Sequence, residues 1–402
     1  MGRSWNDAAL GELLSFANGR SSPERDERFS HPVYGSNGLI GYSEETNADP
    51  DTIIIGRVGS YCGSLHYSSD DCWVTDNAIR ATAIEDNDSR FLYYLLQTLS
   101  LNDWRAGSGQ PLLNQTTLAS IPVRVPPSHE QRAIAGFLGA LDEKIDLNRH
   151  MNETMDAIAR GLFKSWFVDF DPVHAKRVRS HHPQPDKKFL SLFPESFDRH
   201  GTPQGWSTKP LSGIAEFLNG LAMQRFPAIS SSNSLPVIKV SELRSGVTPK
   251  TGRASRGMPA KYVVRDGDFL FSWSGSLIAK FWTGGEGALN QHLFKVTSGR
   301  YPMWFCGHWI YHHLEGFQAI AASKATTMGH IQRRHLKQAM ATCPPDGVLA
   351  ELGHIMENLV DRVIKNELES RTLVEIRDRL LSKLITGELR ILSAVNGRED
   401  AT

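Results

Sequence analysis

The carboxylates best placed for metal chemistry lie in the stretch VDFDP, as Asp169 and Asp171. Paired carboxylates can hold Mg²⁺ for phosphodiester hydrolysis. No Glu-x-Lys element lies near them, and they follow a long helical pattern, so we expect them to form a turn. The histidine pairs His181–His182 and His312–His313 are adjacent in sequence, unlike the i, i+4 spacing of a helical metal site. We therefore expect no catalytic residue and no metal ligand in this chain.

Motifs for cofactors, zinc and membranes are also absent from the sequence. It contains no GxxxxGK[ST] element, no Gly-rich loop after a strand, and no NPPY- or DPPY-like element for amino-methylation. The four cysteines match no zinc or disulfide framework, which favours a reducing cytoplasm. There is no signal-peptide pattern and no apolar run near the roughly 18 residues that span a bilayer. We expect a cytoplasmic, non-enzymatic chain that binds no cofactor and no membrane.

Charge is distributed unevenly along the chain, although the whole is neutral with 44 basic and 44 acidic residues. Residues 206–343 carry 16 Lys and Arg against 6 Asp and Glu, a net charge of +10. Residues 1–127 carry 9 arginines against 16 acids, a net charge of −7. The basic segment suggests a polyanionic partner, and the alternative is a solvated surface of mixed charge.

The basic segment holds side chains suited to nucleic-acid edges. Arg and Lys pair with guanine, whereas Asn and Gln pair with adenine. The stretch SELRSGVTPKTGRASR, which begins at Ser241, is basic, contains glycine and has no acid after Glu242. The cations that we expect to contact DNA here are Lys239, Arg253, Arg256, Lys280, Arg333 and Arg334. The amides that we expect to read adenine are Gln291 and Gln332.

The acidic segment holds fewer candidates. Its acids cluster in separate runs that can face solvent, such as SEETNADPD. Arg57 and Arg105 lie in Gly-bearing loops, which can approach a backbone closely. The candidate DNA contacts are Arg20, Arg57, Arg105, Gln110 and Asn114. Because this segment repels DNA at long range, we expect it to supply base contacts and little nonspecific affinity.

Two long apolar patterns must position these segments. Each follows a proline pair, at Pro126 and Pro344, and Ser128 with Gln131 has the form of a capping box. The first seam is Ile134, Leu138, Leu141, Ile145, Asn148, Asn152, Met155, Ala159, Leu162 and Trp166. The second, offset by 218, is Leu352, Met356, Leu359, Val363, Asn366, Ser370, Leu373, Arg377, Leu380 and Leu384. The polar breaks coincide, and such breaks typically specify register.

Each pattern predicts a helix of about 40 residues, or roughly 60 Å. Neither seam can remain in water, so each helix is the natural partner of the other. An extended antiparallel coiled coil is favoured over a compact bundle, because helices in globular domains average only about 11–12 residues.

The globular segments also repeat. LGELLSFANG at Leu10 resembles LSGIAEFLNG at Leu211, GRVGS at Gly56 corresponds to SWSGS at Ser272, and VTDNAIRAT at Val74 corresponds to LNQHLFKVT at Leu289. The predicted fold is α/β or α+β, with two globular domains, two long helices and pseudo-two-fold symmetry. The expected parts are domain 1 at 1–127, helix 1 at 128–168, a linker at 169–205, domain 2 at 206–343, helix 2 at 344–390 and a tail at 391–402.

The helical segments resemble one known family. They read IPVRVPPSHEQRAIAGFLGALDEKIDLNRHMNETMDAIARGLFKSWFVDFDPV from Ile121 and LLSKLITGEL from Leu380. With PQGW at Pro203 and GSGQPLLN at Gly107, they are similar to specificity subunits of type I restriction–modification systems. The similarity extends over about residues 5–392, and the recognition domains match only in outline.

The resemblance implies a subunit without a catalytic centre, whose two target-recognition domains bind a bipartite site on double-stranded DNA. It implies as partners two methyltransferase subunits, which bind S-adenosylmethionine, and motor-nuclease subunits, which need ATP and Mg²⁺. The alternative from the residues alone is a coiled-coil scaffold whose globular domains bind proteins. Steep salt dependence of DNA binding distinguishes the two.

Overall fold

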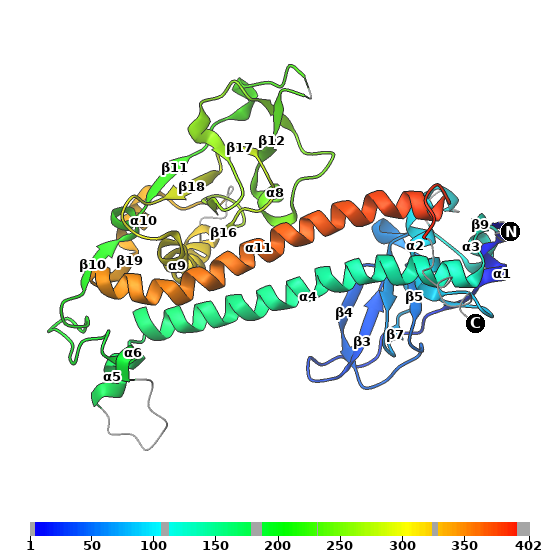
Figure 1. The fold of residues 1–402 in the computed structure, drawn as a ribbon, viewed down its shortest axis with the longest axis horizontal. Coiled ribbons are helices and arrows are strands. Elements are labelled where there is room, and N and C mark those ends of the chain that lie inside the picture. The colour runs from blue at the N-terminus through cyan, green and yellow to red at the C-terminus, as the bar shows by residue number, and fades with distance from the viewer. Residues whose placement is uncertain (1–4, 106–111, 178–186, 231, 324–328, 392–402) are drawn as a thin grey trace, which may run out of the picture. The chain divides into compact units, whose positions relative to one another are not determined.

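The structure is a computed structural model that describes residues 5–105, 112–177, 187–230, 232–323 and 329–391 (Figure 1). It divides into two compact units. Unit 1 consists of residues 1–145 and 372–402, and unit 2 consists of residues 146–371. Within the described ranges, every helix is too short or too polar to cross a bilayer.

Unit 1 is built around two small sheets. The first has the strand order β2 (Leu14–Asn18), β8 (Ala78–Ala83), β5 (Thr52–Gly56) and β6 (Leu65–Ser68), all antiparallel. The second has the order β4 (Gly38–Ser43), β3 (His31–Gly35) and β7 (Trp73–Val74). β1 (Asn6–Ala9) pairs with β9 (Pro122–Val125), and the helical elements are α1 (Leu10–Leu13), η1 (Gly59–Tyr61), α2 (Ser89–Thr98), η2 (Leu101–Trp104) and α3 (Gln115–Ala119). Strand β5 is buried along its whole length, as its run of isoleucines requires.

Unit 2 repeats this arrangement. One sheet has the order β11 (Glu216–Asn219), β18 (Leu293–Thr297), β15 (Phe269–Ser272) and β16 (Ala279–Phe281). The other has the order β13 (Arg253–Ser255), β12 (Ser234–Ile238), β17 (Gly287–Leu289) and β14 (Val263–Val264). β10 (Ser207–Pro210) pairs with β19 (Met340–Cys343) as β1 does with β9.

Short helical elements complete unit 2. They are α5 (Asp171–Arg177), α6 (Lys187–Leu190), α7 (Leu211–Ile214), η3 (Met223–Arg225), α8 (Val240–Ser245), η4 (Ala260–Tyr262), α9 (Met303–Ala322) and α10 (Arg333–Gln338). The first sheet has the same strand order in both units, and the second differs by the additional strand β14 in unit 2, which confirms the internal repeat that the sequence predicts.

The two long helices are α4 (Ser128–Phe167) and α11 (Asp346–Ile385). In unit 2 the Asn152 amide donates to the Val363 carbonyl oxygen (3.1 Å), and the Asn148 amide donates to Ser370 Oγ (3.3 Å), so the helices run antiparallel there (Figure 1). In unit 1 the Arg377 guanidinium lies 2.7 Å from Asp142. Every predicted seam residue is buried or partly buried. The helix pair is therefore confirmed, and the predicted domain boundaries stay predictions.

Gln131 corrects one expectation about the start of α4. It does not close a capping box with Ser128. It is 2% exposed, its Oε1 accepts from Asp88 N (3.0 Å), and its Nε2 donates to Pro126 O (3.0 Å). Its amide thus fastens α4 to the residues preceding α2, because this buried amide must satisfy both its donors and its acceptor.

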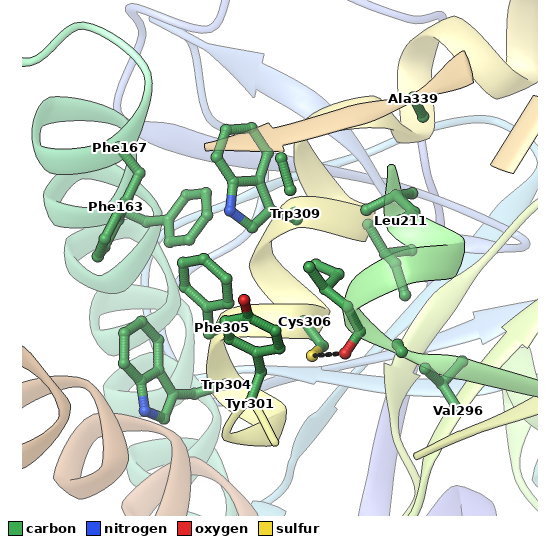
Figure 2. Close-up of a cluster of buried hydrophobic side chains, with 14 of the residues drawn as sticks. Phe163, Phe167, Leu211, Val296, Tyr301, Trp304, Phe305, Cys306, Trp309 and Ala339 are labelled. Carbon is green, nitrogen blue, oxygen red and sulfur yellow. Dashed lines mark hydrogen bonds between the residues drawn. The ribbon is translucent and has the colours of Figure 1, made fainter. Parts of the chain in front are cut away.

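Aromatic side chains attach the C-terminal part of α4 to unit 2 (Figure 2). The ring centroid of Phe163 lies 5.2 Å from that of Trp309, and the ring centroid of Phe167 lies 5.3 Å from that of Phe305. Trp309 and Phe305 belong to α9. Edge-to-face aromatic contacts of this kind add to the stabilisation from buried area. These contacts pack α9 of unit 2 onto the C-terminal part of α4.

Candidate nucleic-acid interface

Four segments of unit 2 meet at one end of the sheet β11-β18-β15-β16. They are Gly220–Leu221, Trp273–Gly275, Asn290–His292 and His330–Gln332, which we call turn cluster 2. Backbone hydrogen bonds join them, from Leu221 N to Leu289 O (3.0 Å), from Trp273 N to His292 O (3.2 Å) and from Ile331 N to Trp273 O (2.9 Å). The strand ends thus hold side chains from four separate stretches of sequence in one place.

The same construction recurs in unit 1. Its segments are Gly19–Arg20, Arg57–Gly59, Thr75–Asn77 and Leu112–Asn114, which we call turn cluster 1. The matching bonds run from Arg20 N to Val74 O (3.0 Å), from Arg57 N to Asn77 O (3.1 Å) and from Leu113 N to Arg57 O (3.0 Å). Arg57 therefore occupies the position of Trp273, and Asn77 that of His292.

One glycine makes each cluster possible. A Cβ on Gly19 would lie 2.1 Å from the carbonyl oxygen of Thr75, and one on Gly220 would lie 2.2 Å from that of Asn290. No side chain fits at such a distance from backbone. The glycines thus permit the close approach that brings the first segment of each cluster to the third.

Turn cluster 2 contains a connected polar network. The Trp273 indole Nε1 donates to Asn219 Oδ1 (2.7 Å) and to the Gln291 carbonyl oxygen (3.1 Å). His292 Nδ1 lies 2.8 Å from Ser274 Oγ, and its Nε2 lies 3.3 Å from Gln291 Nε2. The Trp273 ring also packs on His292 (5.7 Å between centroids) and His330 (6.3 Å).

Chemistry fixes the direction of this network. An amide nitrogen only donates, so Gln291 Nε2 donates to His292 Nε2. Because Nε2 accepts in this arrangement, Nδ1 is the atom that donates to Ser274 Oγ. This pairing uses both ring nitrogens of His292, whereas Gln291 is partly exposed, so its amide oxygen and second N–H are open to a ligand. An amide held in this way can recognise a base edge.

Turn cluster 1 holds different polar side chains on the same frame. Arg57 is partly buried, and its Nε has no hydrogen-bond partner in the described part of the chain. Arg20 is exposed beside it in the cluster. Asn114 Oδ1 accepts from Thr117 N (2.8 Å) and caps α3, which orients its amide. Arginine and amide groups suit guanine and adenine edges respectively.

The predicted site residues fall into three groups. Turn cluster 1 brings together Arg20, Arg57 and Asn114, and turn cluster 2 contains Gln291 and Gln332, followed directly by Arg333 and Arg334. The other described candidates lie elsewhere: Lys239, Arg253, Arg256 and Lys280 in unit 2, and Arg105 after η2. Gln110 lies outside the described residues. All these DNA contacts stay predictions.

Several of the separate cations already have partners in the chain. Arg253 Nε donates to Ser234 Oγ (2.7 Å), and Arg256 pairs with Glu286 (2.8 Å). The Arg256 guanidinium holds the pKa of the Glu286 carboxyl below its usual range. Lys280 Nζ lies 3.9 Å from Glu367 of α11. Exposed Lys239, in contrast, stands at the turn between β12 and α8.

Arg333 lies beside a cavity next to turn cluster 2. Its guanidinium is 5.9 Å from the Phe294 ring centroid and donates to the Phe217 carbonyl oxygen (3.4 Å). The cavity measures about 370 Å³, and Arg333, Lys337 and Glu216 contribute its charged lining. The guanidinium is thus oriented by protein contacts at the edge of the cluster.

Of the groups considered for metal chemistry, His181 and His182 lie outside the described residues. Asp169 pairs with Lys164, and His312 and His313 pack on the Trp309 ring at 5.4 and 5.9 Å. Among the described residues, no three His, Cys, Asp or Glu side chains come together as a metal site. All four cysteines are buried and free.

Sequence reasoning missed the residues at the centre of turn cluster 2, which are Trp273, Ser274, His292 and His330. The signal was present, because SWSGS and LNQHLFKVT are repeated segments. A search for DNA-contacting residues that considers only Arg, Lys, Asn and Gln does not include the side chains of Trp273, His292 and His330.

Three comparisons with known proteins bear on this fold. Residues 3–156 match the model of the type I restriction modification DNA specificity domain. A specificity subunit of the type I restriction enzyme MjaIX from Methanocaldococcus jannaschii is 25% identical over 320 residues, which cover 75% of this chain and 69% of that protein. The HindI specificity subunit from Haemophilus influenzae is 22% identical over 330 residues, covering 69% and 71%.

The fold has a solved counterpart. The crystal structure of a type I S subunit from M. genitalium covers 94% of this chain and 96% of its own, with a TM-score of 0.59 and 14% identity. That similarity concerns the fold alone. In sequence, the chain is similar to specificity subunits of type I restriction enzymes over about 70% of its length, and its residues 3–156 match the type I DNA specificity domain.

Proposed function

We propose that this chain reads a bipartite site on double-stranded DNA, with turn cluster 1 contacting one half-site and turn cluster 2 the other. The observation that carries the proposal is the recurrence of one turn cluster in two units with different polar side chains. The two clusters share a backbone arrangement but carry different polar side chains, which suits the recognition of two half-sites with different DNA sequences. The two long helices serve as the spacer between the readers.

The chain further recruits two methyltransferase subunits and the motor-nuclease subunits. In this proposal it binds no cofactor itself, and S-adenosylmethionine, ATP and Mg²⁺ act on those partners. It contributes recognition, and it performs no catalytic step. The similarity to specificity subunits of type I restriction enzymes supports this division.

The test is co-expression of the chain with its methyltransferase subunit, followed by mapping of methylated adenines across a host genome. The expected result is a split motif with an undefined central gap of constant length. An assembled complex that methylates nothing would contradict the proposal and favour a scaffold that binds only proteins.

A variant in turn cluster 2 and a matched control variant show which half of the methylation motif turn cluster 2 reads. Gln291→Ala should relax one half of the motif and leave the other unchanged, since each good base contact is worth roughly 1–3 kcal/mol of discrimination. Asn358→Ala, an exposed amide on α11, is the control and should leave the motif unchanged. If both half-sites change together in Gln291→Ala, the assignment of turn cluster 2 to one half-site is wrong.

A further inference from the structure

The turn after β5 in unit 1 is two residues longer than its equivalent in unit 2. Ile55 pairs with Leu65 across the β5–β6 turn, whereas the equivalent Phe271 pairs with Ala279 across the β15–β16 turn. Both turns contain a glycine with φ +68°, Gly59 and Gly275. The extra length therefore lies after this shared glycine, next to turn cluster 1.

The longer turn is held in place by its backbone. Gly63 N donates to Gly56 O (2.7 Å), and Gly56 N donates to Ser64 O (2.9 Å). A Cβ on Gly56 would lie 2.3 Å from the Tyr61 carbonyl oxygen, so the turn folds back tightly on this glycine. In unit 2 the equivalent backbone bond runs from Ser272 N to Ile278 O (2.8 Å), and Ser272 Oγ also accepts from Ile278 N (2.7 Å).

This backbone arrangement places Tyr61 outward. Its neighbour Cys62 is 3% exposed within the core of unit 1, and Tyr61 is 56% exposed. Counted from the shared glycine, the equivalent position in unit 2 is Leu277, which is 3% exposed in the core. Each turn thus sends one side chain into the core, Cys62 in unit 1 and Leu277 in unit 2, and the longer turn of unit 1 also presents an exposed tyrosine.

A second aromatic side chain stands on the adjoining turn. Element η2 is anchored by Leu101 (3% exposed), whereas Trp104 is 39% exposed. A Cβ on Gly63 would lie 3.0 Å from Asn102 Oδ1, so the two turns abut. Arg105 is exposed next to Trp104, and its Nε donates to Asn102 O (2.7 Å).

We infer that Tyr61 and Trp104 form an aromatic edge of turn cluster 1 that packs against the sugars and bases of the first half-site. The inference rests on the proposed function and specifies how the acidic domain gains affinity. Residues 1–127 carry a net charge of −7, so attraction to phosphates is weak there. Contacts of the two rings with deoxyribose and base edges bury apolar surface and do not need that attraction.

Tyr61 of the aromatic edge lies on the same turn as Arg57 of turn cluster 1, and this connection favours DNA over a partner subunit as the molecule that contacts the edge. Tyr61 lies four residues after Arg57 on one turn, and Arg57 is bonded through its backbone to Asn77 and Leu113 of turn cluster 1. A DNA duplex that reaches Arg57 and Asn77 therefore comes next to the aromatic edge.

The test measures DNA binding by the assembled complex of this chain with its methyltransferase subunit. The variants are Tyr61→Ala, Trp104→Ala and Tyr61→Phe, and the control is Tyr42→Ala, an exposed tyrosine on β4. The probes are the motif duplex found by methylation mapping and the same duplex with its first half scrambled. Affinity is followed by fluorescence anisotropy between low and moderate salt.

Each alanine variant should bind the motif duplex roughly tenfold more weakly, with the slope of log affinity against log salt unchanged. The deficit should vanish on the duplex with the scrambled first half, and Tyr61→Phe and Tyr42→Ala should bind as the parent does. Parent-like affinity of both alanine variants overturns the inference. Failure of the variants to assemble with the methyltransferase subunit overturns it in favour of a protein interface. If the parent complex itself shows no preference for the motif duplex, the proposed function fails first.

Discussion

At the scale of single residues, His308 shows how burial controls a titratable group in unit 2. It is 5% exposed on α9, and its Nδ1 donates to the Trp304 carbonyl oxygen (2.7 Å). Burial, helped by the charge of Arg160, lowers the pKa of His308 to about 4, against the opposing effect of that hydrogen bond. The imidazole is therefore neutral in the folded chain at physiological pH.

The lowered pKa predicts acid sensitivity of unit 2. Unfolded histidine binds a proton near pH 6.5, so the folded state loses stability as the pH falls from about 6.5 to about 4. The full loss is on the order of 3 kcal/mol in the free energy of unfolding. His308→Phe should flatten this dependence in urea unfolding series followed by tryptophan fluorescence. The control His354→Gln, at an exposed position on α11, should keep the parent's slope. An unchanged slope in His308→Phe would contradict the assignment.

The residues that sequence reasoning found and missed differ in what determines them. Gln291 and Gln332 were predicted because their amide chemistry is visible in the sequence. The exposure of Tyr61 depends on a turn two residues longer than its counterpart, and the pairing of Lys280 with Glu367 joins residues far apart in the chain. Neither the exposure of a side chain on a longer turn nor an ion pair between distant residues produces a local pattern in the sequence.

At the scale of elements, the helix pair carries a buried polar site in unit 2. Asn148 and Asn366 are 0% and 1% exposed. The Asn366 amide donates to Asn152 Oδ1 (2.9 Å), and the Asn148 amide donates to Glu369 Oε2 (2.9 Å). A shift of either helix by one turn would leave these amides buried opposite apolar side chains. The network therefore specifies register.

This network predicts a coupled response to mutation. Asn366→Leu should lower the free energy of unfolding by roughly 1–3 kcal/mol, because Asn152 Oδ1 loses its donor in a partly buried site. The double variant Asn152→Leu with Asn366→Leu should recover much of that loss, since both polar partners are gone. A double-mutant cycle in urea measures the coupling. Strictly additive effects would mean that the two amides act independently.

Elements were the most predictable part of the fold. A seam of ten positions repeated at an offset of 218 left little choice except two paired helices, and they run from 128 to 167 and from 346 to 385. The start of α4 was less predictable. Gln131 fits a capping box by spacing, yet it bonds to Asp88, which is 43 residues away. Local spacing cannot exclude a distant partner.

At the scale of the whole molecule, the two globular segments have similar folds but net charges of opposite sign. The net charge is −7 over residues 1–127 and +10 over residues 206–343. The value of +10 already includes acids that form ion pairs, such as Glu286 with Arg256 and Asp268 with Lys295. Other cations, such as Lys239, are exposed, and in the proposed function they contact phosphates. We therefore expect the basic segment, residues 206–343, to supply most of the nonspecific affinity for DNA, and the acidic segment, residues 1–127, to contribute mainly base contacts.

That division predicts different salt responses for two variants in the complex with the methyltransferase subunit. Lys239→Gln should reduce the slope of log affinity against log salt by about one unit on nonspecific duplex, because one phosphate contact releases about 0.9 counterions. Arg20→Gln should leave that slope unchanged and weaken binding only to duplexes with an intact first half-site. Lys365→Gln, an exposed lysine on α11, controls for the loss of one charge. Equal slope changes in Lys239→Gln and Arg20→Gln would mean that the acidic half also holds phosphates, and that the net charge of a half does not decide its role.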